Sequence, residues 1–463
     1  MVITNLFNFT LLNGYKIITI IRHFNYSGEK FISLFRISLS KEMSIKTCIN
    51  SEIGALEGVV IHEPGPEVEN MTPDNAERAL YSDILNLRIA SMEYRQLKGI
   101  LEKVSKTYEV KTLLEELLED PAIKENLLRE IFIREGLKED AGQYLPEEPK
   151  ELARQLIEGI VLERDNLTRY LSQERFLLKP LHNLFFTRDA SMGINDKIMI
   201  GRMAASVRER ESIIMDFIFN RHPLFDTKTL NPLKPSGNIP SDLKSTIEGG
   251  DFEVAREDVF LIGTGVRTSS QGIDYIIETL KQDKDKTYHI IVKELPPTPE
   301  SFIHLDMVFT FLDTDSCLVY DPVIYGMSRF RTIHMTIEGG KVSLIKEVPN
   351  IPRALKKLGF DLKPVSCGGK DTWVQEREQW HSGANFLAFA PGKLIGYERN
   401  VHTVEELNNM GFEVLKAEEV ISGGANPDNY RKCVITIQGS ELARGGGGAR
   451  CMTMPFRRGV VNW

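Results

Sequence analysis

The sequence contains few cysteines and no closely spaced pair of them. It has five, an odd number, and no two form a CxxC pair: Cys48, Cys317, Cys367, Cys433 and Cys451. This spacing argues against a zinc ribbon and against a framework of disulfide bonds, which both need closely spaced or paired cysteines. Because reduced thiols are typical of the cytosol, we expect a cytoplasmic protein. From the cysteine spacing, we expect no bound metal.

A dense block of positive charge is also missing. The chain has 57 Lys and Arg residues against 65 Asp and Glu residues, which gives a formal net charge of −8. Proteins that bind nucleic acid usually present a basic face, so we expect no nucleic-acid partner.

The third absence is an unbroken apolar run long enough to cross a membrane. Residues 1–24 are rich in apolar side chains, but Asn, Gly and Lys interrupt them, and a small-residue cleavage site is lacking. They fit neither a spanning helix nor a signal peptide, and we expect no membrane partner. We expect residues 1–42 to be an N-terminal extension, with translation beginning at Met43.

What is present is the apolar pattern of a mixed α/β protein. Apolar residues make up 42% of the 463 residues, enough for a full core. The run GALEGVVIHEPGPE (54–67) predicts a strand that ends at Pro-Gly-Pro. Apolar residues then recur at steps of three and four over 76–118 and 122–178, which predicts helices. From Asn183 onward, short β-rich runs such as DVFLIGTG alternate with helical stretches.

Two segments of the second half align residue for residue. LKKLGFDLKPV (355–365) and LNNMGFEVLKA (407–417) each predict a helix end, a Gly-aromatic turn and a strand, and looser copies occupy 101–113 and 280–295. A repeated helix-to-strand unit indicates a modular α/β architecture. A propeller-like arrangement of units and a doubly wound sheet both fit this pattern.

Four polar clusters interrupt the apolar runs. They are NLFFTRD (Asn183 to Asp189), EGGD (Glu248 to Asp251), HLD (His304 to Asp306) and Cys451 after the run RGGGGAR. Taken singly, each has an ordinary explanation: a turn or cap residue, an acidic turn, a structural histidine and an inert buried thiol. On a strand, alternate residues face the same side, so we expect His304 and Asp306 to point together.

Together, a cysteine, a histidine and three carboxylates suit covalent attack on the central carbon of a guanidinium group. A guanidinium has five N–H donors in a fixed fork, and a carboxylate can accept two of them. Two carboxylates can therefore hold the group while its carbon stays open to a thiolate. A histidine can protonate the departing ammonia and then deprotonate water, so the chemistry needs no metal or cofactor.

In order and spacing, FTRD, EGGD, HLD and the terminal GGARCMTMP resemble the motifs of arginine deiminases, within the guanidine-modifying enzyme superfamily. The runs NSEIGALEGVVIHEPGPEVENMTP and REQWHSGANFLAFAPGKLIGYERN are similar to family segments as well, and the resemblance covers residues 48–463. It implies a five-unit pseudo-symmetric α/β propeller with an inserted α-helical domain. We therefore expect the propeller at 48–71 and 179–463, and the insertion at 72–178.

The resemblance also implies hydrolysis of L-arginine to L-citrulline and ammonia through a covalent cysteine intermediate, and we expect a homo-oligomer. In the resemblance, Cys451 is implied to be the nucleophile and His304 the general acid and base. The implied guanidinium ligands are Asp189, Asp306 and Glu248. The substrate carboxylate is implied to pair with Arg208 and Arg267, and the implied substrate-lining positions are Asn183 and Phe186. Glu248 is also implied to contact the histidine.

One position departs from the family pattern. Relatives often have Arg or Asn five residues before the cysteine, where this chain has Gly446 within GGGG. We expect weaker substrate affinity or weaker loop closure, with the chemistry retained. The glycines before Cys451 predict a mobile loop that closes over the ligand.

Other functions compete with this interpretation. An agmatine deiminase, a dimethylarginine hydrolase or an amidinotransferase shares the chemistry, but agmatine has no carboxylate for Arg208 and Arg267 to bind. A silent arginine-binding protein would not need every reactive position to be filled. An RNA-binding segment or a phosphate loop at RGGGGAR is disfavoured, because flanking aromatic residues and a Gly-Lys-Ser/Thr ending are both missing.

Overall fold

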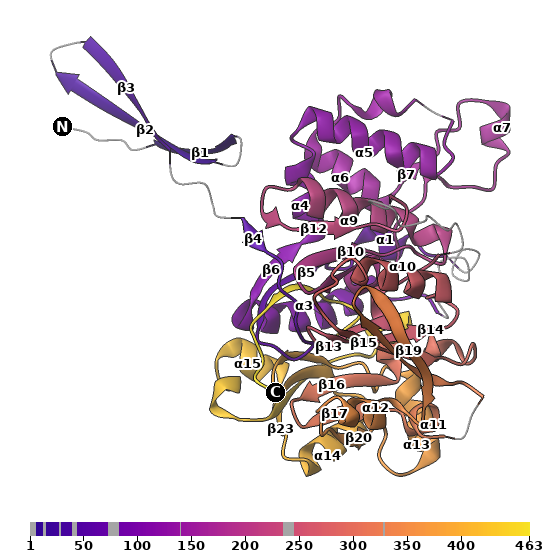
Figure 1. Cartoon of the computed structure of the whole chain (residues 1–463). Helices are drawn as coiled ribbons and strands as arrows, with labels where there is room; N and C mark the ends of the chain where they lie inside the picture. The colour runs from indigo at the N-terminus through magenta and orange to yellow at the C-terminus, as the bar shows by residue number, and fades with distance from the viewer. Residues whose placement is uncertain are drawn as a thin grey trace.

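The computed structural model describes residues 6–12, 15–26, 29–38, 44–72, 83–138, 140–234, 245–326 and 329–463. Strands and helices alternate along most of these residues, which confirms the mixed α/β class (Figure 1). Among the described helices, none has the length and apolar character needed to cross a membrane.

Five small sheets share one pairing plan. In each, two strands pair antiparallel, and a third strand joins the pair in parallel. Sheet by sheet, the strands are β9 (Ser191–Ile194), β10 (Lys197–Ile200) and β12 (Lys228–Leu230); β13 (Phe252–Arg256), β14 (Val259–Thr264) and β15 (Tyr288–Glu294); β16 (Phe309–Asp313), β17 (Ser316–Val319) and β20 (Lys363–Ser366); β21 (Leu387–Ala390), β22 (Lys393–Tyr397) and β24 (Cys433–Ile437); and β25 (Met454–Arg458), β5 (Leu56–Ile61) and β6 (Lys106–Glu109).

A helix precedes the parallel strand in each of these sheets. The helices are α9 (Glu209–Arg221), α10 (Ser270–Leu280), α12 (Ile351–Lys357), α15 (Ala417–Ser422) and α3 (Leu87–Val104). The predicted repeat is confirmed, because α12 leads to β20 and α14 (Val401–Asn409) leads to β23 (Glu413–Lys416) through one glycine turn each. Gly359 and Gly411 hold these turns at φ values of 95° and 86°. The looser copies are also helix-to-strand units, α3–β6 and α10–β15.

The two ends of the described core meet in one sheet. The predicted strand within 54–67 is confirmed as β5, which lies between β25 and β6. β25 follows Cys451 by three residues, so its pairing with β5 fixes the end of the chain beside that cysteine. The nucleophile predicted from the sequence is therefore held by the first and the last parts of this core.

Helices dominate the described part of 72–178, with three short strands among them. After α3, the helices of this region are α4 (Val110–Leu117), α5 (Pro121–Arg134), η1 (Ala141–Tyr144), α6 (Pro149–Glu158) and α7 (Leu167–Tyr170). The helical region predicted over 76–118 is interrupted by β6, where Thr107 and Tyr108 favour a strand and pair with β5, as the looser repeat copy at 101–113 indicated. β7 (Ile160–Val161) and β8 (Phe176–Leu178) form a second interruption. Residues 73–82 and 139 of the predicted insertion lie outside the described residues.

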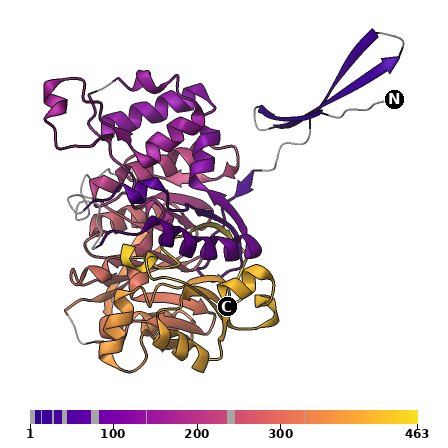
Figure 2. The same cartoon turned by 180° about the vertical axis from the view of Figure 1, so that it is seen from behind.

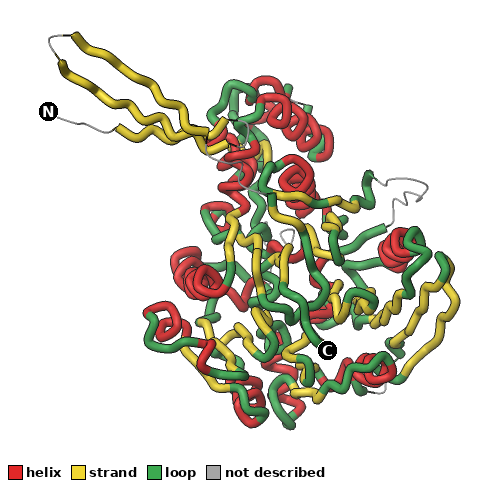
Figure 3. The backbone as a smooth tube through the Cα atoms, turned by 60° about the vertical axis from the view of Figure 1, so that its left-hand side comes forward, coloured by secondary structure: helices red, strands yellow, loops and turns green. Residues whose placement is uncertain are grey.

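The remaining elements extend or connect these parts. β18 (Thr332–Glu338) and β19 (Lys341–Val348) continue the sheet of β15, and β4 (Ile45–Lys46) pairs with β11 (Phe225–Asp226). β1 (Leu6–Leu12), β2 (Tyr15–Tyr26) and β3 (Glu29–Ser38) form a separate sheet that stands away from the other elements in Figures 1, 2 and 3. The short helices are α1 (Pro66–Glu69), α8 (Thr187–Ala190), η2 (Ser206–Arg208), η3 (Gly249–Asp251), η4 (Glu300–Phe302), η5 (Leu305–Met307), α11 (Asp321–Ile324), α13 (Thr372–Trp380), η6 (Pro427–Asn429) and η7 (Leu442–Gly445).

Candidate active site

Cys451 lies in a turn between η7 and β25, directly after the glycine run. It is 3% exposed, and its Sγ lies 3.6 Å from Asp306 Oδ2. Burial, and then the negative charges of Asp306 and Asp189, raise the pKa of the thiol well above its usual range. These surroundings favour the protonated thiol, and a cation bound beside the two carboxylates would favour the thiolate.

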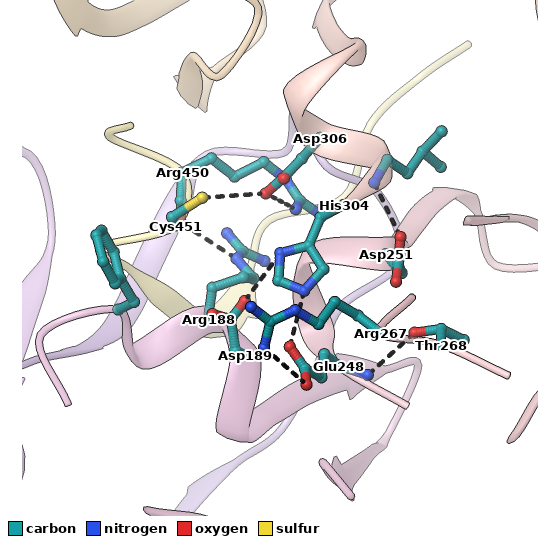
Figure 4. A network of polar contacts seen from close by, with 12 residues as sticks. Arg188, Asp189, Glu248, Asp251, Arg267, Thr268, His304, Asp306, Arg450 and Cys451 are labelled. Atoms are coloured by element: carbon teal, nitrogen blue, oxygen red, sulfur yellow. Dashed lines mark hydrogen bonds and ion pairs between the residues drawn. The ribbon is translucent and has the colours of Figure 1, made fainter. Parts of the chain in front are cut away.

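His304 precedes η5, and its ring lies close to two carboxylates (Figure 4). Nε2 lies 2.9 Å from Glu248 Oε2, and Nδ1 lies 3.6 Å from Asp189 Oδ1. Burial lowers the pKa of the ring, but Asp189 and Glu248 outweigh burial and raise this pKa to about 9. The ring is therefore charged at neutral pH and can donate a proton.

The prediction that His304 and Asp306 lie on a strand is wrong. His304 has an extended backbone, but residues 305–307 turn into the 3-10 helix η5. Asp251 Oδ1 accepts a hydrogen bond of 2.9 Å from the Leu305 N–H, which ties this turn to the EGGD segment. His304 and Asp306 still contribute to the same site, because the turn presents both side chains beside Cys451 (Figure 4).

The EGGD segment brings Glu248 against the His304 ring. A Cβ atom on Gly250 would lie 2.4 Å from His304 Nδ1, so only glycine allows this close approach. Burial raises the pKa of the Glu248 carboxyl, but His304 and Arg267 outweigh burial and bring this pKa to about 2. Glu248 is therefore a carboxylate at neutral pH, and it holds the ring through Nε2.

Asp189 and Asp306 each bind an arginine with one oxygen and keep the other oxygen free of hydrogen bonds. Arg208 Nη1 donates to Asp189 Oδ2 at 2.6 Å, and Arg450 Nη1 donates to Asp306 Oδ2 at 2.8 Å. Within the described part of the chain, the buried Oδ1 atoms of both carboxylates accept no hydrogen bond. A buried acceptor without a donor is costly, so these two atoms mark where N–H groups of a ligand fit.

Arg267 lies at the border between this centre and a cavity of about 710 Å³. Its Nη1 atom lies 3.8 Å from Glu248 Oε1. The cavity is also lined by Arg399, Arg444 and Gly446. Gly446 has a φ of 85°, and a Cβ atom there would meet nothing within 4 Å. Three arginines, Arg267, Arg399 and Arg444, and two acids, Asp83 and Glu300, therefore line this side of the site, which has room for the carboxylate of a ligand.

Arg208, Asn183 and Phe186 lie deeper than Arg267. Arg208 is buried, and its Nη2 atom donates to Glu211 Oε2 at 2.8 Å, in addition to the bond from Nη1 to Asp189. The same Nη2 atom makes longer bonds, of 3.5 and 3.4 Å, to the carbonyl oxygens of Asn183 and Phe186. Arg208 thus holds Asp189 and the segment before it in place.

Two residues that complete the centre were missed by the sequence interpretation. Arg450 binds Asp306 and also donates to Glu52 Oε2 at 3.2 Å, and Asn385 Nδ2 donates to Cys451 Sγ at 3.2 Å. Arg450 could have been suspected as a charge directly beside a buried cysteine. Asn385 follows Ala384 in a mostly apolar run before β21, where no spacing or motif distinguishes it.

Asp189, Glu248 and His304 could in principle ligate a cation, because their ligand atoms lie within 4.8 Å of one another. Without a bound metal ion, the raised pKa of His304 keeps its ring charged, so the ring can act as a proton donor. The free carboxylate oxygens are better suited to a planar organic cation with several N–H donors. With a thiol and a proton donor alongside, the site can perform covalent attack on such a cation.

Comparison with known proteins agrees with this chemistry. A family model described as arginine deiminase matches residues 77–458. An arginine deiminase of Bacillus cereus (strain ATCC 10987) is 33% identical over 436 residues, which cover 89% of this chain and 98% of the relative. An arginine deiminase of Oenococcus oeni is 30% identical over 427 residues, which cover 89% and 97%. The solved structure of an amidinotransferase from the saxitoxin biosynthetic pathway of Microseira wollei has a TM-score of 0.51 at 14% identity, covers 90% of this chain and 98% of that chain, and shows a shared fold.

Proposed function

This chain belongs to the arginine deiminase family, and from that membership we propose that it hydrolyses L-arginine to L-citrulline and ammonia. The observation that carries the proposal is the pair of buried oxygens, Asp189 Oδ1 and Asp306 Oδ1, that lack a hydrogen-bond donor beside Cys451. A guanidinium group supplies donors on both of its edges and a positive charge between two carboxylates.

In the first half of the reaction, the bound guanidinium lowers the pKa of the Cys451 thiol, whose proton passes to solvent. The thiolate attacks the guanidinium carbon, and an S–C bond forms. His304 gives a proton from Nδ1 to one amino group, because Nε2 is held by Glu248. The C–N bond to that group then breaks, ammonia leaves, and an amidino group remains on the sulfur.

In the second half, water attacks the same carbon from the place that ammonia has left. The neutral His304 ring takes a proton from this water, which restores the charged ring for the next cycle. The C–S bond breaks, its electron pair returns to sulfur, the new hydroxyl group gives its proton to solvent, and L-citrulline is released. Protons from solvent restore the Cys451 thiol and convert the departed ammonia to ammonium. The positive charge of the substrate leaves as ammonium.

The arginine side chains are proposed to bind the amino-acid end of the substrate. Arg267 is the better placed, because it borders both Glu248 and the cavity. Arg208 could reach the carboxylate by giving up its longer bonds to the carbonyl oxygens of Asn183 and Phe186. Asn183 and Phe186 line the site beside Asp189. A carboxylate clamp of this kind would distinguish arginine from agmatine.

We further propose that the five sheets with the shared pairing plan are the units of a five-unit pseudo-symmetric propeller. The plan of an antiparallel pair plus a parallel strand, repeated in all five, supports this arrangement. The proposed catalytic domain comprises 48–71 and 179–463, with the helical insertion at 72–178 and an extension at 1–42. One part of 72–178 departs from these bounds: because β6 pairs with β5, we place β6 and the helix α3 with the catalytic sheets.

We also propose a cytoplasmic homo-oligomer that needs no metal, cofactor or nucleic acid. All five cysteines are free thiols, which supports a reducing compartment. The proposed mechanism uses only side chains of the chain and water.

The test is to assay L-arginine and agmatine with the metal-free protein and with its Cys451→Ala and Arg267→Ala variants. We expect L-citrulline and ammonia in equal amounts from arginine alone. The Cys451 variant should bind arginine without turnover. Arg267→Ala should raise KM for arginine by about tenfold, the loss of one charge-assisted pair. Formation of carbamoylputrescine from agmatine would instead indicate an agmatine deiminase. An unchanged preference for arginine over agmatine in Arg267→Ala would contradict the proposed binding of the substrate carboxylate by Arg267.

A further inference from the structure

Asn385 uses its whole side-chain amide to hold the segment that carries the nucleophile. Its Oδ1 atom accepts hydrogen bonds from the backbone N–H groups of Arg450, at 3.0 Å, and of Cys451, at 3.2 Å. Its Nδ2 atom donates to the Asp306 carbonyl oxygen at 3.2 Å and to Cys451 Sγ at 3.2 Å. Two backbone donors on one side and a carbonyl acceptor on the other fix which end of the amide is nitrogen.

The glycine run is shaped around this residue. A Cβ atom on Gly448 would lie 2.6 Å from the Asn385 carbonyl oxygen and 2.7 Å from Asn385 Oδ1. The backbone at Gly448 therefore packs against Asn385 so closely that a larger side chain would not fit there. This is a second observation, independent of the hydrogen bonds, that the turn before Cys451 is built on the Asn385 amide.

We propose that Asn385 is a catalytic residue that stabilises the Cys451 thiolate through its Nδ2–H group. The proposal rests on the function proposed above and adds a residue to it. The need for such a donor follows from the surroundings, since the carboxylates of Asp306 and Asp189 both oppose negative charge on the sulfur. The backbone N–H of Gly448 and the charge of Arg450 act in the other direction, and Asn385 adds a neutral side-chain donor that contacts the sulfur itself.

The contact would act at two points of the reaction. Before attack, the Nδ2–H group stabilises the electron pair on sulfur that goes on to form the S–C bond. When the second tetrahedral intermediate collapses, the C–S bond breaks and the same electron pair returns to sulfur, where the amide again donates. Asn385 keeps its own protons throughout, so the proton balance stays with His304 and water.

The experiment compares the wild-type protein with Asn385→Ala, Asn385→Asp and Asn400→Ala. The rate at which iodoacetamide alkylates Cys451 is followed against pH by mass spectrometry of its peptide, which gives the midpoint of thiol ionisation without any substrate. Asn400 is a matched control, since it is equally buried and donates to the His381 carbonyl oxygen at 3.1 Å, away from Cys451. Thermal unfolding of each variant is measured alongside.

Loss of one hydrogen bond to sulfur should move the alkylation midpoint of Asn385→Ala upward by about one pH unit and lower kcat by about tenfold or more. Asn385→Asp keeps the acceptor but places a carboxylate beside the sulfur, so its midpoint should rise further. Asn400→Ala should keep the wild-type midpoint. If Asn385→Ala does not fold, Asn385→Leu takes its place, because it has a similar size, lacks the donor and adds no charge.

An unchanged midpoint in the folded Asn385 variants would overturn the proposal, even if kcat fell together with thermal stability. This outcome is distinct from a failure of the proposed function. A wild-type protein that released no citrulline would remove the reaction, while the alkylation midpoints would still report whether Asn385 stabilises the thiolate.

Discussion

Single residues of this site divide their atoms between contacts within the protein and the places that we propose for the ligand. Asp189 and Asp306 each give one oxygen to an arginine and leave the other without a hydrogen bond, and His304 gives Nε2 to Glu248. The carboxylates are fixed in direction by these internal bonds before any substrate arrives. Such preorganisation means that binding energy need not be used to orient the groups that hold the guanidinium.

The charge on His304 can be tested by its titration. In a Cys451→Ser variant with labelled histidine, NMR should show two rings that titrate near pH 9, His304 and His62, well above the ordinary value of about 6.5, and only the His304 ring lies beside Glu248. Because its pKa is raised in the folded state, the ring stabilises the fold fully below the unfolded pKa. This stabilisation is lost as the pH rises through about 9.

Glu248→Gln is the matching variant for this titration. It removes one of the three carboxylates that raise the pKa of His304, the others being Asp189 and Asp251, so the midpoint should fall toward neutrality. A wild-type midpoint near 6.5 would mean that the ring is mostly neutral at working pH, and the proposed proton donation to ammonia would then lack its donor.

The sequence reveals those site residues that stand out from their neighbours. Asp189, His304 and Cys451 interrupt apolar runs, and EGGD is an unusual acidic turn, so their types suggested a guanidinium site. Asn385 did not stand out, because its role depends on a backbone approach between segments 66 residues apart. The strand predicted through His304 failed for a related reason, since Asp251 imposes the turn at Leu305 from a distant segment.

At the scale of elements, the glycine run is a tightly packed connection as much as a hinge. A Cβ atom on Gly447 would lie 2.5 Å from the Phe186 ring and 3.0 Å from Cys451 Cβ. Gly446 differs from it, because it needs glycine for its positive φ and has open space around it. Glycines in this run therefore serve different purposes, and only those packed against the site control where the sulfur lies.

Gly447→Ala should lower kcat/KM for arginine by at least about tenfold, because the added methyl group must displace Phe186 or Cys451. Gly411→Ala is the control, since Gly411 has a positive φ of 86° in the turn before β23 and open space around it. It should cost about 1 kcal/mol of stability and leave kcat/KM unchanged. Steady-state kinetics and denaturant unfolding of both variants provide the comparison. Full activity in Gly447→Ala would show that the loop can move away from Phe186 at no cost.

At the scale of the whole molecule, the mixed α/β class and several helix-to-strand units could be read from repeated segments, and the pairing of the two ends of the core could not. The turns at 355–365 and 407–417 are local, so their pattern was visible in the sequence. The pairing of β25 with β5 joins residues almost 400 positions apart, which no local pattern encodes. The periodicity over 76–118 did not show where the helices stop and β6 begins, because the four residues of β6 become a strand by pairing with the distant β5.

The same topology predicts which end of the chain can be removed. Among the strands that the structure describes, β1, β2 and β3 pair only with one another, and the sheets that carry the site begin at β5. A chain that starts at Met43 should keep the arginine turnover and the melting temperature of the full chain, because it retains β4 and its pairing with β11.

Removal of residues 454–463 should instead abolish turnover and the cooperative melting transition, since it takes away β25 and exposes an edge of β5 directly beside Cys451. Activity and calorimetry of the two truncated chains decide the matter: a loss of turnover in the chain from Met43 would mean that residues 1–42 support the site.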